Sequence, residues 1–198
     1  MLKRTLLIFF ALFTVALAKA QTDDVVYNQY LDFNLAHLQG ETERAMGLGQ
    51  DILPNVAKLS AKQQIHFFYT IGNLFENDNQ SVKAIEYYEK VAAAVPDFYV
   101  VQRGLGYLYA KQADDIAAQL NAAQSDINEN KRLTLKYAAA VKKALPHLEK
   151  AQACDPDDDT LKLIKSMYKN IKDTQSAATL NARLATMSKS CIDLLDDK

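Results

Sequence analysis

The chain has 198 residues, which is enough for one domain or a short array of repeats. It contains no Trp, 6 Gly and 4 Pro, and it shows no sustained alternation of apolar and polar residues, so it favours helices over a sheet. Its formal net charge of −1 lacks the basic excess of a nucleic-acid-binding protein. We therefore expect an all-helical protein that does not bind nucleic acid.

Residues 1–20 have the pattern of a secretory signal peptide. Lys3 and Arg4 give a positive start, residues 5–18 are apolar, and residues 18–20 read Ala-Lys-Ala, which suits signal peptidase. The apolar run is shorter than the ~20 residues that span a bilayer, although an uncleaved anchor is the alternative. We predict cleavage after Ala20 and a periplasmic or secreted protein without stable membrane insertion. Cleavage lowers Lys plus Arg from 23 to 20 against 24 Asp and Glu, so the mature net charge is −4.

Residues 21–64 are predicted to form a degenerate helix pair. Apolar residues at helical spacing indicate one helix up to Leu38, followed by a turn at Gln39-Gly40. A second helix is expected from Glu41 to Leu59, with Pro54 kinking or breaking it because proline removes a backbone donor. Ser60 is the expected cap of the next helix.

Residues 65–98 carry the clearest pattern in the chain. Residues 68–75 read aromatic-x-x-aliphatic-Gly-x-x-aromatic, residues 84–88 read Ala-x-x-x-aromatic, and Pro96 closes the pattern. Gly72 and Ala84 are small, as residues must be where two helices cross closely, and the aromatic residues would fill the space around the crossing. Gly106 repeats Gly72 after 34 residues, a period that is typical of stacked helical repeats.

Residues 99–157 are predicted to be a second, interrupted repeat. Ala144 and Pro156 each follow their counterparts in the first repeat by 60 residues, which is 26 more than one period. We therefore expect an insertion at about 113–138, built as two lengthened helices that project as a hairpin with a turn at 126–130. Their apolar stripes would pair with each other, or with a partner as the alternative. Pro146 should kink the returning helix.

Residues 158–198 are expected to complete the array. An acidic turn at 157–159 precedes one helix, and a last helix at about 177–195 would cap the stack with its polar face. Cys154 and Cys191 would then lie near the ends of neighbouring helices, whose axes pack about 8–10 Å apart. That spacing favours two separate, half-buried thiols, with a disulfide as the alternative in an oxidising compartment.

The repeat pattern resembles the tetratricopeptide repeat. The stretch 144–151, Ala-Leu-Pro-His-Leu-Glu-Lys-Ala, followed by Asp155-Pro156, is similar to the second helix of that family. The resemblance is strong over 65–98, good at both ends of 99–157, and weak over 25–60 and 158–195. It implies a right-handed, all-α solenoid of antiparallel helix pairs in a small secreted or periplasmic bacterial protein. It also implies protein–protein interaction and scaffolding through a concave groove, without catalysis.

The sequence carries no complete catalytic or metal-binding motif. The acidic run from Asp155 begins like a calcium loop, but Thr160 and Ser166 stand where the loop needs Gly and a bidentate Glu. The three histidines have no Cys or His partner at metal-ligand spacing; they are His37, His66 and His147. Neither a Gly-x-Ser-x-Gly elbow nor a glycine-rich phosphate loop is present. We therefore predict no catalytic residue, no metal and no cofactor, and a hydrolase is only a third alternative.

The candidate binding residues are Tyr69 and Asn73 in the first repeat and Arg103 and Tyr107 in the second, all expected on the concave face. Tyrosine supplies contact area, and Asn and Arg can grip a peptide backbone or a carboxylate. The alternative is that these tyrosines only pack against neighbouring helices. Arg103 and Lys162 are the only cations expected there, which does not support a carboxylate clamp.

We expect a non-catalytic interaction or scaffold module of the cell envelope that binds a protein or peptide in its groove. A small-ligand or glycan-binding accessory protein using the same groove is the alternative.

Overall fold

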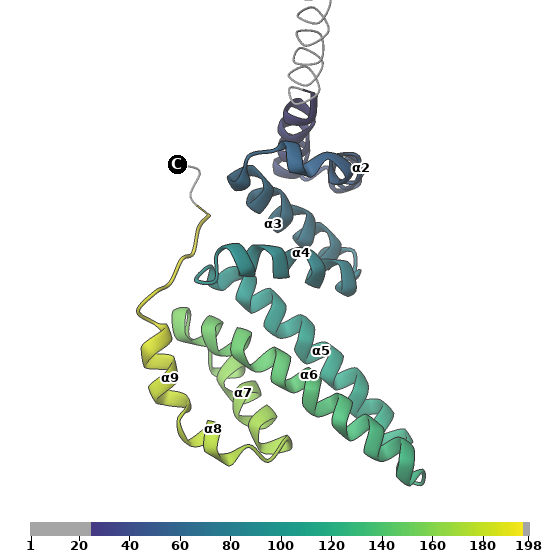
Figure 1. The fold of residues 1–198 in the computed structure, drawn as a ribbon, viewed down its shortest axis with the longest axis vertical. Coiled ribbons are helices and arrows are strands. Elements are labelled where there is room, and N and C mark those ends of the chain that lie inside the picture. Colours follow the sequence, from purple (N-terminus) through teal and green to yellow (C-terminus); the bar gives the residue numbers. More distant parts are fainter. Residues whose placement is uncertain (1–24, 196–198) are drawn as a thin grey trace, which may run out of the picture. The chain divides into compact units, whose positions relative to one another are not determined.

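The computed structural model describes residues 25–195, and this part of the chain is helical, with neighbouring helices packed on one another (Figure 1). The prediction of an all-helical protein is confirmed over these residues, which contain one isolated β-bridge and no strand. The predicted signal peptide lies outside the described residues. No helix within 25–195 is long and apolar enough to cross a bilayer. The chain divides into two compact units, residues 1–78 and 79–198.

Unit 1 is built from a helix over residues 25–38, α2 (Thr42–Ile52), the short 3-10 helix η1 (Leu53–Lys58) and α3 (Ala61–Asn77). The first helix turns into α2 at Gly40, whose φ of 73° lies in the left-handed region that glycine adopts at low cost. The rings of Phe33 and Phe67 lie 5.1 Å apart in the core, and both side chains are fully buried. Gly49 on α2 packs closely on Ile71 and Phe33, since an added methyl group would lie 2.5 Å from Ile71 Cδ1 and 3.1 Å from Phe33 Cε2.

Two local predictions for unit 1 are confirmed. Pro54 breaks the predicted second helix, because α2 ends at Ile52 and the chain continues as η1. Ser60 caps α3 with a complete capping box. Its Oγ accepts from the Gln63 amide at 3.4 Å, and Gln63 Oε1 accepts from the Ser60 amide at 2.9 Å.

Unit 2 is organised around a long antiparallel hairpin. It contains α4 (Ser81–Ala94), α5 (Tyr99–Ala122), α6 (Ile127–Cys154), α7 (Asp158–Asn170), α8 (Thr174–Ala178) and α9 (Leu180–Met187). In Figure 1 the far end of the α5–α6 hairpin extends beyond α7, α8 and α9. The turn falls at residues 123–126 rather than the predicted 126–130, because Asp126 caps α6 by accepting from the amides of Asn128 and Glu129, each at 3.0 Å. Helix α6 continues through Pro146 without ending.

A close backbone approach joins α5 to α6 at Gly106. A methyl group added there would lie 2.7 Å from Leu148 Cδ2 and 3.0 Å from the backbone nitrogen of Leu148. A glycine therefore fits this crossing where a larger side chain would clash. The buried side chains around it include Leu105, Tyr109 and Ala144.

The C-terminal segment differs from the prediction of a helix up to residue 195. Helix α9 ends at Met187, the chain turns at residues 188–190, and an extended segment around Ile192 then pairs with Phe98 at the beginning of α5. There the amide of Ile192 donates to the Asp97 carbonyl at 2.8 Å, and the amide of Tyr99 donates to the Ile192 carbonyl at 3.1 Å. The backbone groups that would have continued the helix are thus bonded to another part of unit 2.

The prediction of two separate thiols is wrong, because Cys154 and Cys191 form a disulfide. The prediction placed both cysteines on packed helices, whose axes lie too far apart. Cys154 does end α6, but Cys191 lies in the extended segment, which approaches until the two Cα atoms are 5.6 Å apart. The bond closes a loop that contains α7, α8 and α9.

Candidate functional site

Two of the four predicted site residues lie together on one face of α5. Arg103 and Tyr107 are one helical turn apart, and both contact the chain at the beginning of α7. Arg103 Nη2 lies 2.7 Å from Asp155 Oδ2 and 3.1 Å from the Asp155 carbonyl oxygen. Its guanidinium also lies 5.6 Å from the centre of the Tyr99 ring. The cation is therefore held by an acid and an aromatic ring and is not free.

The Tyr107 hydroxyl belongs to a directed chain of hydrogen bonds. It lies 2.7 Å from Thr160 Oγ1, and the Thr160 hydroxyl donates to Asp157 Oδ1 at 2.9 Å. Because the Thr160 proton is used by the carboxylate, Tyr107 is the donor to Thr160. Hydrogen bonds from the backbone and side chain of Thr160 hold the pKa of Asp157 below its usual value, which keeps this acceptor ionised.

Tyr107 keeps a large accessible surface although its hydroxyl is fixed. The residue is 41% exposed, while the Thr160 beneath its hydroxyl is buried. For Tyr107, the hydroxyl is thus engaged within the protein while the residue as a whole stays accessible. An aromatic side chain held in one orientation at the surface loses little conformational entropy when a partner covers it.

The other two predicted residues, Tyr69 and Asn73, lie one turn apart on α3 of unit 1. Asn73 Oδ1 accepts from Asn77 Nδ2 at 3.1 Å, and Tyr69 is half-buried. Burial raises the pKa of the Tyr69 hydroxyl, and the nearby charge of Glu76 raises it further. The structure thus gives two pairs of candidate residues, one in each unit.

The two cations that the sequence places on this face, Arg103 and Lys162, are both paired with carboxylates. Lys162, the second cation expected there, lies 2.8 Å from Asp159 Oδ1 and is exposed. Both cations already face carboxylates of the same unit. A ligand carboxylate would have to compete with Asp155 for Arg103.

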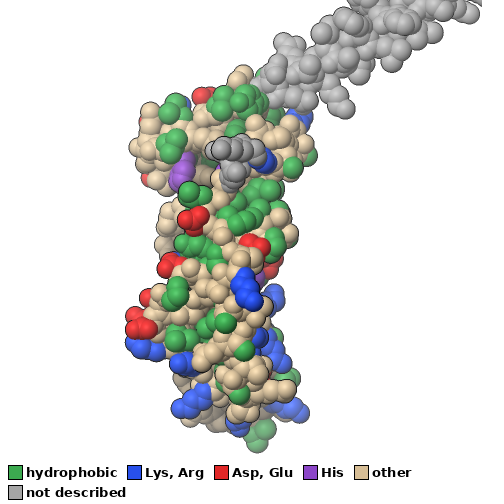
Figure 2. Space-filling model, turned by 90° about the vertical axis from the view of Figure 1, so that its left-hand side faces the viewer, with side chains coloured by type: hydrophobic (Ala, Val, Ile, Leu, Met, Phe, Trp, Pro, Cys, Tyr) green, Lys and Arg blue, Asp and Glu red, His purple; other side chains and the backbone are tan. Residues whose placement is uncertain are grey.

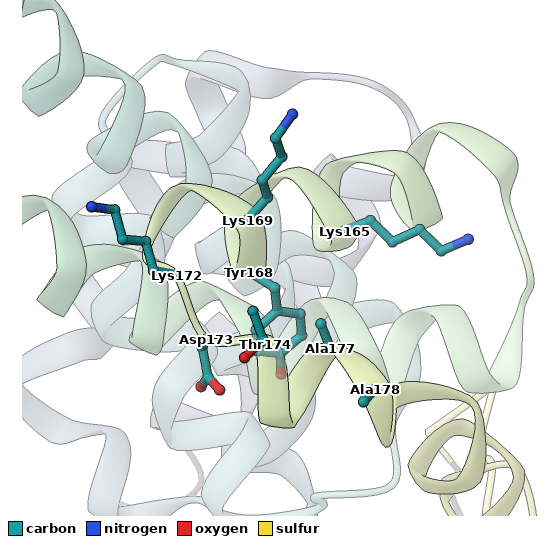
Figure 3. Close-up of a pocket in the computed structure, with 8 residues that line it drawn as sticks. All are labelled: Lys165, Tyr168, Lys169, Lys172, Asp173, Thr174, Ala177 and Ala178. Atoms are coloured by element: carbon teal, nitrogen blue, oxygen red, sulfur yellow. The ribbon is translucent and has the colours of Figure 1, made fainter.

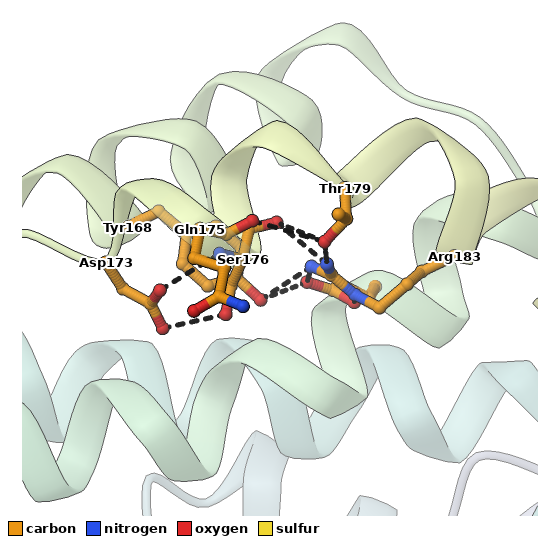
Figure 4. A network of polar contacts seen from close by, with 7 residues as sticks. Tyr168, Asp173, Gln175, Ser176, Thr179 and Arg183 are labelled. Atoms are coloured by element: carbon orange, nitrogen blue, oxygen red, sulfur yellow. Dashed lines mark hydrogen bonds and ion pairs between the residues drawn. The ribbon is translucent and has the colours of Figure 1, made fainter.

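A buried ionic network on α6 was not predicted from the sequence. Arg183 of α9 donates to both oxygens of Glu149, which is 3% exposed, and the Tyr168 hydroxyl donates to the same carboxylate. Figure 4 shows the outer part of this network, where Arg183 also reaches Thr179 and the Ser176 carbonyl, and Asp173 binds Ser176. These residues join α6, α7, α8 and α9. Every polar group in the network has a protein partner, which is typical of a structural cluster.

A second unpredicted cluster surrounds Lys150, which is 9% exposed. Its ammonium lies 2.6 Å from Asp97 Oδ1 and donates to the carbonyls of Met187 and Ser190. The hydrogen bond from Lys150, followed by that from Ser190, lowers the pKa of Asp97. The cluster anchors the extended C-terminal segment next to the disulfide. In the sequence, the only sign of this cluster is that Lys150 lies among apolar residues in the second helix of the interrupted repeat.

His147 is fixed as a neutral side chain within unit 2. Its Nδ1 lies 2.5 Å from Gln102 Oε1, and Gln102 Nε2 donates to the Pro96 carbonyl at 2.8 Å. Because Gln102 uses its oxygen as the acceptor, His147 carries its proton on Nδ1. Burial lowers the pKa of His147, which opposes protonation of the second nitrogen.

A hollow in unit 2 lies between α7 and α8 and has a volume of about 520 Å³ (Figure 3). Tyr168, Thr174, Ala177 and Ala178 line it together with three lysines and Asp173. No group of three or more metal-ligating side chains within 25–195 is placed to hold a metal ion.

Comparisons with known proteins assign no family to the chain. No protein-family model matches it, and no curated protein matches it.

Proposed function

We propose that this protein is a tetratricopeptide-like helical solenoid that acts as a non-catalytic interaction module of the cell envelope. In this proposal it binds a protein or peptide through the α5 face around Tyr107 and Arg103, and the α3 face with Tyr69 and Asn73 is a separate candidate face of unit 1. The observation that carries the proposal is Tyr107, which is 41% exposed while its hydroxyl is held by Thr160.

The chemistry of this face suits recognition of a protein surface. Tyrosine and arginine are enriched among the residues that dominate binding energy at interfaces. The Asp155 carboxylate and the Thr160 hydroxyl hold the two side chains before a partner arrives, so less freedom is lost on binding. The surrounding helices are fixed by the close contact of Gly106 with Leu148.

The repeat assignment is supported by two independent features. The sequence has a 34-residue period between Gly72 and Gly106. At Gly106, the repeat pattern requires a small residue at a helix crossing, and this glycine does lie against the backbone of a neighbouring helix.

Export from the cytoplasm is part of the proposal and is supported by the bond between Cys154 and Cys191, because disulfides persist mainly in oxidising compartments. The signal-peptide pattern of residues 1–20 points to the same compartment. N-terminal sequencing of the protein recovered from its natural cells tests this part. A chain that begins at Gln21 supports export with cleavage, and a chain that retains residues 1–20 contradicts it.

Affinity capture from envelope extract, followed by binding measurements with the purified partner, tests the binding face. Tyr107→Ala should weaken binding by roughly ten-fold, the size of a moderate interface hot spot. Tyr27→Ala is the matched control, because Tyr27 is 43% exposed and lies in the other unit. A partner that is lost with Tyr27→Ala and retained with Tyr107→Ala would rule out the α5 face.

A further inference from the structure

Helix α7 begins with Asp158 and Asp159, and the rest of the helix and the turn after it carry a run of lysines. Residues 160–172 contain four lysines and no acidic residue. Lys162 is paired with Asp159, whereas Lys165, Lys169 and Lys172 are exposed and form no ion pair within residues 25–195. The local charge is opposite in sign to the net charge of the chain. In Figure 2, Lys and Arg side chains predominate over the lower part of unit 2, which includes α7 and α8.

The three unpaired lysines surround the α7–α8 hollow. Their side chains leave α7 and its C-terminal turn in three different directions (Figure 3). The ammonium groups diverge in this structure and do not converge on one small anion. They can instead contact a ligand whose negative charges are about as far apart as the three ammonium groups.

The one acid in the hollow offsets part of this charge but forms no ion pair with the three lysines. Asp173 accepts hydrogen bonds from the Ser176 amide at 3.0 Å and the Ser176 hydroxyl at 2.8 Å, so its carboxylate is used to cap α8. The charges of Lys142 and Arg183 also act on Asp173 and help to lower its pKa, behind the larger effect of the hydrogen bonds from Ser176. The three lysines at the rim are thus left without a carboxylate partner.

The floor of the hollow is mainly apolar. Tyr168, Ala177 and Ala178 form it, together with the aliphatic parts of the lysine side chains. A concave apolar floor with a cationic rim is complementary to an apolar side chain flanked by carboxylates. A flat anionic surface would contact the rim but leave the floor empty.

Lys172 occupies a backbone conformation that lysine rarely adopts. Its φ is 58°, at the position after α7 where glycine is common, because the Asp173 amide turns back to the Tyr168 carbonyl at 3.0 Å. A residue with a side chain is less stable than glycine in this conformation. The chain thus keeps a cation at the rim where glycine would be the more stable residue.

We propose that the α7–α8 hollow is a docking site for an acidic amphipathic helix of another protein. The helix would place its carboxylates against Lys165, Lys169 and Lys172 and one apolar side chain against Tyr168 and the two alanines. Acidic residues three and four positions apart lie about 5–6 Å from one another on a helix surface, which resembles the spacing of lysines along α7. Neither Arg103 nor Tyr107 lines this hollow, so the site is separate from the α5 face and stands without it.

Fluorescence anisotropy with a labelled synthetic peptide tests the site. The probe is a helical peptide of about 16 residues with Glu at positions i, i+4 and i+7 and a Leu beside them, and its control has Gln in place of each Glu. Lys165→Gln with Lys169→Gln should weaken binding of the acidic peptide roughly ten-fold, as expected for the loss of two charge contacts. The control, Lys111→Gln with Lys131→Gln, removes the same charge from exposed positions of α5 and α6. It should change the affinity for the acidic peptide by less than about two-fold.

A single substitution separates binding from folding. Lys172→Gly should raise the melting temperature and yet weaken peptide binding, a combination that damage to the fold cannot produce. Three results would overturn the proposal. All the variants could bind the acidic peptide equally, the Gln peptide could bind as tightly as the Glu peptide, or the two double variants could lose the same affinity. Binding to vesicles of anionic phospholipid with the same lysine dependence, and no binding to the peptide, would also overturn it in favour of a membrane contact.

Discussion

Arg183 Nη2 lies 2.6 Å from Glu149 Oε1, and Arg183 Nε lies 2.9 Å from Glu149 Oε2. The guanidinium of α9 thus satisfies both oxygens of a buried carboxylate on α6, 34 residues earlier in the chain. The pair holds the last helix of unit 2 on the α5–α6 hairpin. The contribution of this pair to the free energy of unfolding should appear when only one partner is removed, because the other charge then remains buried without compensation.

Arg183→Met should lower the free energy of unfolding of unit 2 by about 3 kcal/mol, since Glu149 is 3% exposed and would keep only its bond from Tyr168. Glu149→Met combined with Arg183→Met should recover part of this loss, because no charge is left buried. Urea denaturation measures both. Lys90→Met is the control: it removes an exposed pair with Glu86 and should cost less than about 1 kcal/mol. A loss for Arg183→Met no larger than for this control would contradict the assigned role.

Gly106→Ala should destabilise unit 2 by about 1–2 kcal/mol. The new methyl group would meet the backbone nitrogen of Leu148 at 3.0 Å, which cannot move aside as a side chain can, and this exceeds the gain in helix propensity. Gly47→Ala is the matched control, because a methyl group on Gly47 in α2 meets nothing within 4 Å. That substitution should stabilise by about 0.5–1 kcal/mol. Thermal unfolding of both variants tests the contrast, and opposite signs are expected.

Replacing both cysteines by serine should lower the free energy of unfolding by about 2–4 kcal/mol, because the bond between Cys154 and Cys191 closes a loop with a sequence separation of 37 residues. Treating the unchanged protein with a dithiol reductant should reproduce the loss. Alkylation of the unfolded protein, followed by mass spectrometry, checks the bond itself. No adduct is expected before reduction and two after it. Two adducts without reduction would show that the thiols are separate.

His147 should make stability depend on pH. In the unfolded chain His147 has the ordinary pKa of 6.5, and burial lowers its pKa in the folded protein. At a pH between these two pKa values, the unfolded chain binds more protons than the folded one. Stability therefore falls as pH decreases through this interval and levels off below the folded pKa. His147→Gln keeps a donor for Gln102 and removes the titration, and it should flatten the profile below about pH 6.5. Identical slopes for both proteins in urea denaturation would contradict this.

Local features of the fold could be predicted where one residue decides the backbone. Pro54 ends α2 because it lacks an amide proton, and Ser60 caps α3 through its own hydroxyl. The C-terminal segment could not be predicted in this way. Its apolar spacing continues to Ile192, but bonds to Asp97, Tyr99 and Cys154 hold it in an extended conformation.

The candidate site could be predicted only in part. The period of the sequence places Arg103 and Tyr107 on one face of α5, and the structure has them there. The contacts that hold them come from Asp155 and Thr160, more than fifty residues later, and no spacing within the sequence indicates that pairing. The charge pattern of α7 was visible in the sequence, but the hollow beside it depends on how α8 folds back.

Site-specific photocrosslinking at position 107 tests the proposed function most directly. A photoreactive phenylalanine analogue at Tyr107 keeps the exposed ring, and the same analogue at Asp114, which is exposed two turns further along α5, serves as the control. After illumination in envelope extract, position 107 should give one discrete adduct with a protein partner, and position 114 should not. No adduct at position 107, or the same adducts at both positions, would contradict an interaction face on α5.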